Sequence, residues 1–202
     1  PYPCFIREKG EYLSLFSGAR DEKRVGEASV WYLYSRLAAA EIKEFCPDAS
    51  IIIMLRNPVD MIYSLHSQRI YSGNEDITDF EAALDAEEDR KQGLRIPKGV
   101  NLVEGLFYRE VTKYTLQVQR YLDVFGRENI HIIIFDDFKS DITQIYRDTC
   151  QFLGVDPNFQ PEFQVINPNK HIYSFKLHNF LQNPPRTVVS LSRRLVPCPL
   201  RH

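Results

Sequence analysis

Two short, almost wholly apolar runs, separated by long helical patterns, constrain the fold of this chain more than any other feature. Residues 50–55 read SIIIML and residues 129–135 read NIHIIIF. Strands that are buried on both faces of a parallel sheet have such continuous apolar sequences. Strands that alternate with helices favour an α/β fold with a central parallel sheet. Ligands of such sheets bind beyond the carboxyl ends of the strands, so functional residues are sought there.

The remaining periodicity predicts one more strand and a series of helices. We expect a strand over residues 24–29, helices over residues 31–45, 79–92, 105–125 and 141–153, and a helix that begins at Asn57-Pro58. Asn is a preferred N-cap, and Pro is a preferred first helical residue. A capping-box pattern at residues 78–81 starts the helix over residues 79–92, whose carboxylates are interpreted as a solvated face. Gly126 and Gly154 are expected to end the last two helices.

The composition is that of a soluble globular protein, and we expect residues 1–202 to form a single domain. Of the 202 residues, 44% are hydrophobic and 26% are charged, with a formal charge of −2. These values exclude disordered and collagen-like chains. No uncharged apolar run in the sequence approaches the ~20 residues that span a bilayer. The chain begins at Pro1 without Met or a signal-peptide pattern, so we expect it to be an N-terminally incomplete part of something longer.

Charge is unevenly distributed along the chain. No acidic residue follows Glu162, and the remaining residues carry six basic ones: Lys170, Lys176, Arg186, Arg193, Arg194 and Arg201. This basic segment is either a solvated tail or an anion-binding element. A nucleic-acid patch is disfavoured, because the basic residues are not clustered with stacking aromatic residues.

Four cysteines lie far apart in the sequence: Cys4, Cys46, Cys150 and Cys198. Their spacing suits neither a zinc site nor a small disulfide scaffold. A reducing compartment is therefore expected, with two disulfides as the alternative. No metal is expected.

One constellation of polar residues follows the first apolar run. Arg56 lies at the carboxyl end of the predicted strand, Asn57-Pro58 opens the next helix, and Ser64 lies in its second turn. A guanidinium, a hydroxyl and the positive end of a helix dipole together bind a phosphate monoester. The alternative is structural: Arg56 pairs with a surface carboxylate and Ser64 merely occupies a helical position.

This segment resembles the 3′-phosphate-binding segment of sulfotransferases that use 3′-phosphoadenosine 5′-phosphosulfate (PAPS). The similarity extends upstream to residues 26–33 (GEASVWYL) and downstream through Tyr114, residues 125–128 (FGRE) and residues 152–155 (FLGV), and covers residues 24–175. The upstream stretch is similar to carbohydrate-type and heparan-type members. The resemblance implies a three-layer fold like that of P-loop NTPases, PAPS as cosubstrate, and Arg56 and Ser64 as ligands of its 3′-phosphate.

Glu27 is the residue that the resemblance implies as the general base. It lies at the end of the predicted strand over residues 24–29, where a carboxylate could take the proton of an acceptor hydroxyl. The alternative interpretation is a helix N-terminal glutamate that the helix dipole favours. His66 and His171 are alternative bases.

A phosphate loop is missing from the sequence. Asp136-Asp137 follow an apolar strand, as the magnesium-binding acid of P-loop NTPases does. However, none of the nine glycines begins the Gly-x4-Gly-Lys-Ser/Thr loop that should accompany it, so the pair is interpreted as a helix cap. The loop that sulfotransferases use for the 5′-phosphosulfate is also absent, and we expect it upstream of Pro1. Lys170 lies where the family has a mobile basic loop over the cofactor, and Arg193-Arg194 could attract an anionic acceptor.

Three functions are consistent with these patterns. The first is transfer of a sulfuryl group from PAPS to a hydroxyl of a saccharide, a lipid or a small molecule. The second is a catalytically incomplete binding or interaction module with the sulfotransferase fold. The third, a nucleotide kinase with a displaced phosphate loop, is the weakest. We expect a cytoplasmic protein, or one of the Golgi lumen if the chain is cut from a eukaryotic membrane-anchored enzyme.

Overall fold

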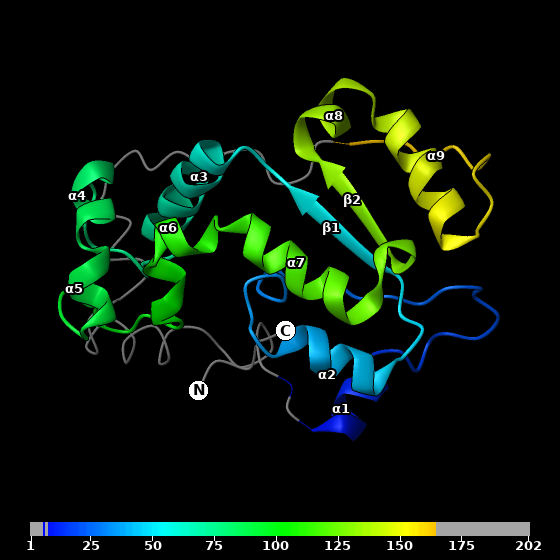
Figure 1. Ribbon diagram of the computed structural model, residues 1–202, viewed down its shortest axis with the longest axis horizontal. Helices are drawn as coiled ribbons and strands as arrows, with labels where there is room; N and C mark the ends of the chain where they lie inside the picture. The colour runs from blue at the N-terminus through cyan, green and yellow to red at the C-terminus, as the bar shows by residue number, and fades with distance from the viewer. Residues whose placement is uncertain (1–5, 7, 165–202) are drawn as a thin grey trace, which may run out of the picture. The chain divides into compact units, whose positions relative to one another are not determined.

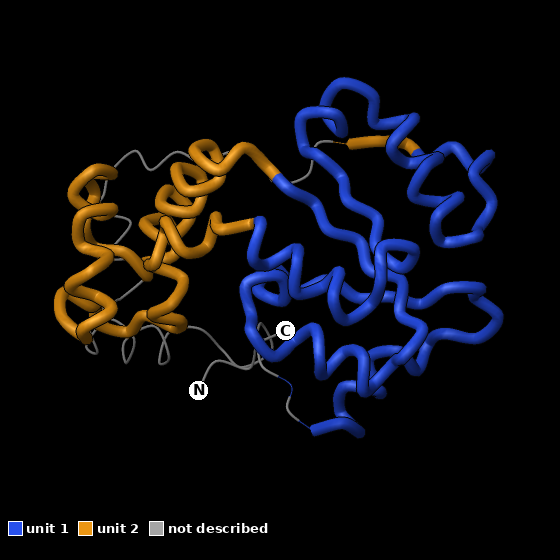
Figure 2. The backbone as a smooth tube through the Cα atoms, viewed as in Figure 1, with its two compact units in different colours: residues 1–55, 115–161 blue, residues 56–114, 162–202 orange. Residues whose placement is uncertain are grey.

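The computed structural model describes residue 6 and residues 8–164 of the chain. The chain forms two compact units (Figure 2). Unit 1 consists of Pro1–Leu55 and Thr115–Pro161, and unit 2 of Arg56–Tyr114 and Glu162–His202. The basic C-terminal segment, with Lys170 and His171, lies outside the described residues.

Unit 1 contains a parallel pair of strands, β1 (Ile51–Leu55) and β2 (Ile130–Ile134) (Figure 1). Ile51 lies opposite Ile130, and the register continues to Leu55 opposite Ile134. The helices of unit 1 are α1 (Lys9–Ser14), α2 (Ala38–Phe45), α7 (Tyr114–Phe125, whose first residue belongs to unit 2), the 3-10 turn η2 (Arg127–Asn129), α8 (Phe135–Ser140) and α9 (Ile142–Leu153). The predicted α/β class and the two predicted parallel strands are confirmed.

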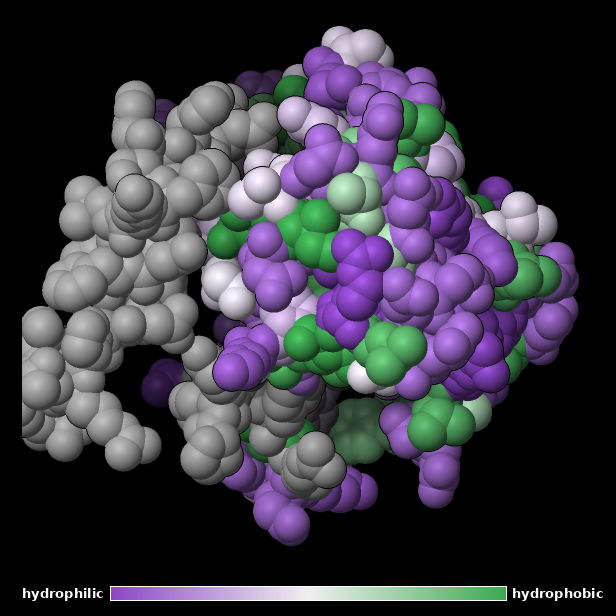
Figure 3. Space-filling model, turned by 90° about the vertical axis from the view of Figure 1, so that its left-hand side faces the viewer, coloured by the Kyte–Doolittle hydropathy of each residue, from purple (hydrophilic) through white to green (hydrophobic). Residues whose placement is uncertain are grey.

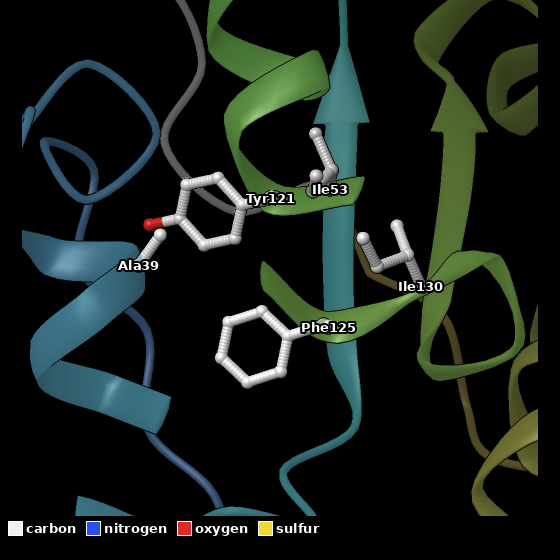
Figure 4. Packing of buried hydrophobic residues seen from close by; sticks show 5 residues of the cluster. All are labelled: Ala39, Ile53, Tyr121, Phe125 and Ile130. Carbon is white, nitrogen blue, oxygen red and sulfur yellow. The ribbon is translucent and has the colours of Figure 1, made fainter. Parts of the chain in front are cut away.

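The core of unit 1 lies between the sheet and two helices. Ile53 and Ile130 of the strands pack with Tyr121 and Phe125 of α7 and with Ala39 of α2 (Figure 4). All five are at most 5% exposed. Burial of an isoleucine or phenylalanine side chain contributes roughly 1.5–3 kcal/mol to folding.

The other face of β1 differs from the sequence prediction. Alternate side chains point to opposite faces of a strand, and Ile52 and Met54 are 43% and 47% exposed. The prediction that both faces are buried is therefore wrong for β1 in the part of the chain that the structure describes. The apolar run identified the strand correctly but did not specify its surroundings.

Residues 24–45 also differ from the prediction. Residues 24–29 form no strand, and the helix begins at Ala38 because residues 30–34 form a turn. Ser35 Oγ accepts hydrogen bonds from the N–H groups of Leu37 and Ala38, both at 3.2 Å. A serine that bonds nearby backbone groups in this way competes with helix formation. The apolar residues at helical spacing over residues 31–37 therefore lie before the helix and not in it.

Unit 2 is helical in its described residues. It contains α3 (Pro58–Tyr71), α4 (Phe80–Asp85), α5 (Glu87–Lys91), the 3-10 turn η1 (Val103–Leu106) and α6 (Tyr108–Val111). The predicted start of α3 is confirmed: Asn57 Oδ1 accepts from the N–H of Val59 at 3.0 Å, and Pro58 is the first helical residue.

Two predicted helices are interrupted. The helix expected over residues 79–92 bends at Ala86, which is fully buried, and becomes α4 and α5. The helix expected over residues 105–125 is divided into η1, α6 and α7. Thr112 ends α6, and its hydroxyl lies 3.4 Å from the carbonyl oxygen of Tyr108. β-Branched residues such as Val111 and Thr112 continue a helix less readily than straight-chain residues.

The helix ends follow the sequence signals closely, with one exception. Gly126 and Gly154 have φ values of 78° and 66° and follow the last residues of α7 and α9, as predicted. This left-handed region favours glycine. Asp136-Asp137 do not cap α8, because Ile134 occupies the N-cap position and the pair lies in the first turn.

The interpretation of the carboxylates of residues 79–92 as a solvated face is wrong for Glu87. Its side chain is 1% exposed, and its Oε2 accepts from the N–H of Arg109 at 2.8 Å. The neighbouring Glu88 is exposed, with a side-chain exposure of 75%.

On the face drawn in Figure 3, hydrophilic side chains predominate among the described residues, and hydrophobic ones lie in small groups between them.

Candidate functional site

Arg56 is the first residue of unit 2 and directly follows β1. Its side chain is partly buried, and its positive charge acts on the phenol of Tyr114. Burial raises the pKa of Tyr114 above its ordinary value, and the charge of Arg56 partly offsets that rise. A cation and a phenol therefore lie near each other in unit 2.

The N-terminus of α3 differs from an open anion-binding helix end. Asn57 Oδ1 accepts from the N–H of Val59 at 3.0 Å and from that of Asp60 at 3.5 Å. The N–H of Met61 donates to Asn57 O at 2.9 Å, and Pro58 has no N–H. The first-turn donors are thus occupied within the helix. An anion here would be bound by side chains and by the field of the helix dipole.

Ser64 lies in the second turn of α3 and is partly buried. It belongs to unit 2, as Arg56 does. The structure therefore places both predicted phosphate ligands in one compact unit, on a single continuous segment that ends β1 and begins α3.

Glu27 belongs to unit 1 and lies in an exposed, irregular segment. The predicted strand that would have placed it at the edge of the sheet is absent. A hydrogen bond with the Glu27 carboxylate raises the pKa of the Tyr32 phenol to about 12, and burial adds to this rise. Burial, and secondarily the charge of Glu27, also raise the pKa of Tyr12. One carboxylate and two phenols therefore lie together in unit 1.

Sequence reasoning missed Tyr32. The only available signal was its place five residues after Glu27 in the GEASVWYL stretch. The prediction of one helix over residues 31–45 gave Tyr32 no role at the site. The turn at residues 30–34 instead places it beside the carboxylate.

The alternative base His66 has a structural environment. It is 4% exposed, its Nε2 lies 2.9 Å from Ile77 O, and its ring packs against those of Phe80 and Tyr108. These contacts hold α3 against the following loop. The other alternative, His171, lies outside the described residues, as do Lys170 and Arg193-Arg194.

The described residues offer neither a metal-binding cluster nor a membrane-spanning helix. Residues 6 and 8–164 contain no group of three or more His, Cys, Asp or Glu side chains that could hold a metal ion. Within the same part of the chain, no helix has the length and apolar character needed to span a bilayer.

Comparisons with known proteins identify a family and a similar fold. A family model described as "Sulfotransferase domain" matches residues 37–192, a range that includes Arg56 and Ser64 but not Glu27. The structure described as "Crystal Structure of Sulfotransferase from Alicyclobacillus acidocaldarius" is similar to this chain, with 41% sequence identity and a TM-score of 0.70. The match covers 81% of this chain and 63% of that chain. No curated protein matches.

Proposed function

The chain belongs to the sulfotransferase family and has its α/β fold. We therefore propose that it is part of a PAPS-dependent sulfotransferase. The reaction would move a sulfuryl group from PAPS to a hydroxyl group of an acceptor. The observation that supports this most directly is the presence of Arg56 and Ser64 on one segment at the start of α3. The chain spans 63% of the length of the solved relative, so the experiments below use the complete gene product.

Arg56 and Ser64 would hold the 3′-phosphate of the donor. A guanidinium can make two parallel charged hydrogen bonds to a phosphate, and a serine hydroxyl can donate a third. Because Asn57 already occupies the first helical N–H groups, these side chains would supply most of the binding energy. The group that suits these two side chains is thus a phosphate monoester, as the 3′-phosphate of PAPS is.

Glu27 would act as the general base. As the acceptor oxygen forms its bond to sulfur, the bond between sulfur and the 5′-phosphate oxygen breaks. The acceptor proton moves to the Glu27 carboxylate, and 3′-phosphoadenosine 5′-phosphate (PAP) leaves. Positioning and electrostatic stabilisation carry most of the catalysis in such transfers. The exposed setting of Glu27 is compatible with access by an acceptor hydroxyl.

The test of the donor site is calorimetric titration of the complete protein with PAP. We expect Arg56→Ala to weaken binding by about 2 kcal/mol, roughly 30-fold, because a charged hydrogen-bonded contact is lost. Arg95→Ala is the matched control, since Arg95 is an exposed arginine of the same unit that pairs with Asp89 at 3.5 Å. If Arg56→Ala bound PAP with unchanged affinity, Arg56 would not be a ligand of the 3′-phosphate.

Turnover distinguishes the enzyme from a binding module of the same fold. Sulfuryl transfer from labelled PAPS to members of an acceptor panel would support the proposed reaction. PAP binding that depends on Arg56, without transfer to any hydroxyl acceptor, would instead favour the binding module.

A further inference from the structure

One side of α3 packs against the rest of unit 2. His66 and Arg69 are 4% and 8% exposed. Ile62 and Leu65 pack against a buried cluster that α4, η1 and α6 provide. Successive residues of an α-helix are rotated by about 100° around its axis, so Ser64 lies about 200° from both Ile62 and His66. Ser64 is therefore on the side of α3 that is roughly opposite to the packed one.

His66 adds a directional contact to this packing. Its Nε2 lies 2.9 Å from Ile77 O. Because a carbonyl oxygen can only accept a hydrogen bond, His66 Nε2 is the donor. Apolar packing is non-directional, whereas a hydrogen bond requires its donor and acceptor to be aligned. The bond therefore restricts rotation of α3 around its axis more tightly than the apolar contacts do.

The acceptor of this bond is itself held in the interior of unit 2. The N–H of Ile77 donates to Glu75 Oε1 at 2.9 Å. The Glu75 carboxylate is paired with Arg90, and both side chains are fully buried. The hydroxyl of Tyr108 donates to Glu75 Oε2 at 2.8 Å, and its ring lies edge to face with the His66 ring, with centroids 5.8 Å apart. The contacts thus form a closed cycle of four residues: His66, Ile77, Glu75 and Tyr108.

We propose that His66 is a positioning residue of the donor site: its hydrogen bond to Ile77 O sets the rotation of α3 and thereby directs the Ser64 hydroxyl toward the 3′-phosphate. This inference rests on the proposed function, in which Ser64 binds that phosphate. His66 does not contact the nucleotide and acts only through the helix that carries Ser64.

A small rotation of α3 would be enough to disturb the Ser64 contact. Because Cα atoms lie about 2.3 Å from the helix axis, a rotation of about 25° moves the Cα atom of Ser64 by about 1 Å. Its hydroxyl, farther from the axis, moves more, and a hydrogen bond of about 2.8 Å would then exceed its usual range. A serine has a single heavy-atom torsion with which to compensate, whereas the long side chain of Arg56 has several.

The experiment compares the binding of two nucleotides to the complete protein by calorimetry. PAP carries the 3′-phosphate, and adenosine 5′-phosphate lacks it. His66→Phe keeps an aromatic ring beside Phe80 and Tyr108 but removes the donor. We expect it to weaken PAP binding about 3- to 10-fold, no more than loss of the Ser64 contact itself. The affinity for adenosine 5′-phosphate should not change, and an equal loss for both nucleotides overturns the inference.

Two further variants of His66 test the role of its donor. His66→Gln can still donate from its amide group and should retain most of the PAP affinity. His66→Asn is too short to reach Ile77 O and should show the same selective loss of PAP binding as His66→Phe, which keeps the test available if the latter does not fold. Wild-type PAP affinity in a folded His66→Phe or His66→Asn variant overturns the inference.

A double-mutant cycle shows whether His66 acts through Ser64. In that case, His66→Phe should cause no further loss of PAP affinity in the Ser64→Ala background. A loss of the same size in both backgrounds would mean that His66 supports unit 2 in general, and would overturn the inference.

His131→Phe is the matched control. His131 lies near the start of β2 in unit 1, and its ring stacks on that of Phe152 with centroids 5.3 Å apart. The same substitution there should leave PAP affinity unchanged. The Ser64→Ala variant tests the underlying proposal. Unchanged PAP binding in it would refute Ser64 as a ligand, whereas weakened binding in it with wild-type affinity in His66→Phe refutes only the positioning role.

Discussion

At the scale of single residues, the surroundings of Arg56 and Ser64 depend on nearby sequence, and those of Glu27 depend on residues far along the chain. Arg56 and Ser64 lie on one continuous segment whose cap, Asn57, and first residue, Pro58, are visible in the sequence. The backbone carbonyl of Tyr32, the neighbour of Glu27, accepts a hydrogen bond from Tyr121, which lies 89 residues after Tyr32 in the chain. The local structure around Arg56 and Ser64 was therefore predictable from a short motif, and the surroundings of Glu27 were not.

Ser64 provides the second test of the donor site. A serine that donates to a charged phosphate contributes about 1.5 kcal/mol or more, so Ser64→Ala should weaken PAP binding roughly tenfold. The effect should be smaller than that of Arg56→Ala, because one hydrogen bond is lost and no charge. Ser67→Ala, at an exposed position of the same helix, should leave the affinity unchanged in the same titration. Equal affinities for both serine variants would show that Ser64 only packs within α3.

Glu75 is the centre of a buried ionic network in unit 2. Its two carboxylate oxygens accept from Arg90 at 2.7 and 2.8 Å, and Tyr108 donates to Oε2 at 2.8 Å. The side chains of Glu75 and Arg90 are both 0% exposed. Burial alone would raise the pKa of Glu75, but the hydrogen bonds from Arg90, Ile77 N–H and Tyr108 hold it below its ordinary value. The network joins the loop after α3 to α5 and α6.

This pKa shift makes the contribution of Glu75 to stability depend on pH. We expect Glu75→Gln to lower the free energy of unfolding by about 3 kcal/mol or more at pH 7, because it leaves the charge of Arg90 buried without its partner. The carboxylate is more acidic in the folded chain, so its contribution is present above the unfolded pKa of about 4.3 and is lost as the pH falls through the lower folded value. Denaturant titrations at pH 7 and at successively lower pH should therefore show the difference between variant and wild type shrinking.

The matched control for Glu75 is Glu88→Gln. Glu88 pairs with Lys91 at 2.8 Å but is 75% exposed, and exposed ion pairs contribute little. Its effect on unfolding should be close to zero at every pH. A loss in Glu75→Gln no larger than that in the control, or one that does not change with pH, would contradict the assignment of the network.

At the scale of secondary-structure elements, sequence signals gave the ends of helices better than their continuity. Asn57, Gly126 and Gly154 act locally, through one cap or one left-handed residue, and all three predictions are confirmed. Ala86 and Thr112, where two predicted helices are interrupted, are neither glycine nor proline and so carry no strong helix-ending signal. Periodicity over residues 79–92 and 105–125 could not reveal these interruptions, because short helices in succession keep a similar pattern.

The start of α4 allows a direct test of capping. The capping-box pattern began at Thr78, but the structure has Asp79 as N-cap, with Oδ1 accepting from the N–H of Ala82 at 2.8 Å. Asp79→Ala should therefore lower the free energy of unfolding by about 1 kcal/mol. Thr78→Ala should have a smaller effect in the same chemical denaturation experiment. If the Thr78 variant proved the less stable of the two, the cap would lie one residue earlier.

At the scale of the whole molecule, the apolar runs were sufficient to predict the class of the fold. The parallel pair β1 and β2 and the sulfotransferase fold are confirmed. The division into two compact units, with a boundary after Leu55, was not predicted from the sequence. The exposure of one face of β1, with Ile52 and Met54, could not be predicted either. An apolar sequence indicates that a strand can be buried, but it does not specify which elements cover the strand.

The cap of α3 has a consequence for how mutations would affect this protein. Asn57 uses the backbone donors that many phosphate sites present to their ligand. A site built on backbone N–H groups survives most substitutions, because every residue except proline supplies the same donor. Here the proposed contacts reside in the side chains of Arg56 and Ser64, so a single missense change would weaken donor binding while the helix stays intact. Natural variants at these two positions are thus expected to lower the affinity for the donor without unfolding the protein.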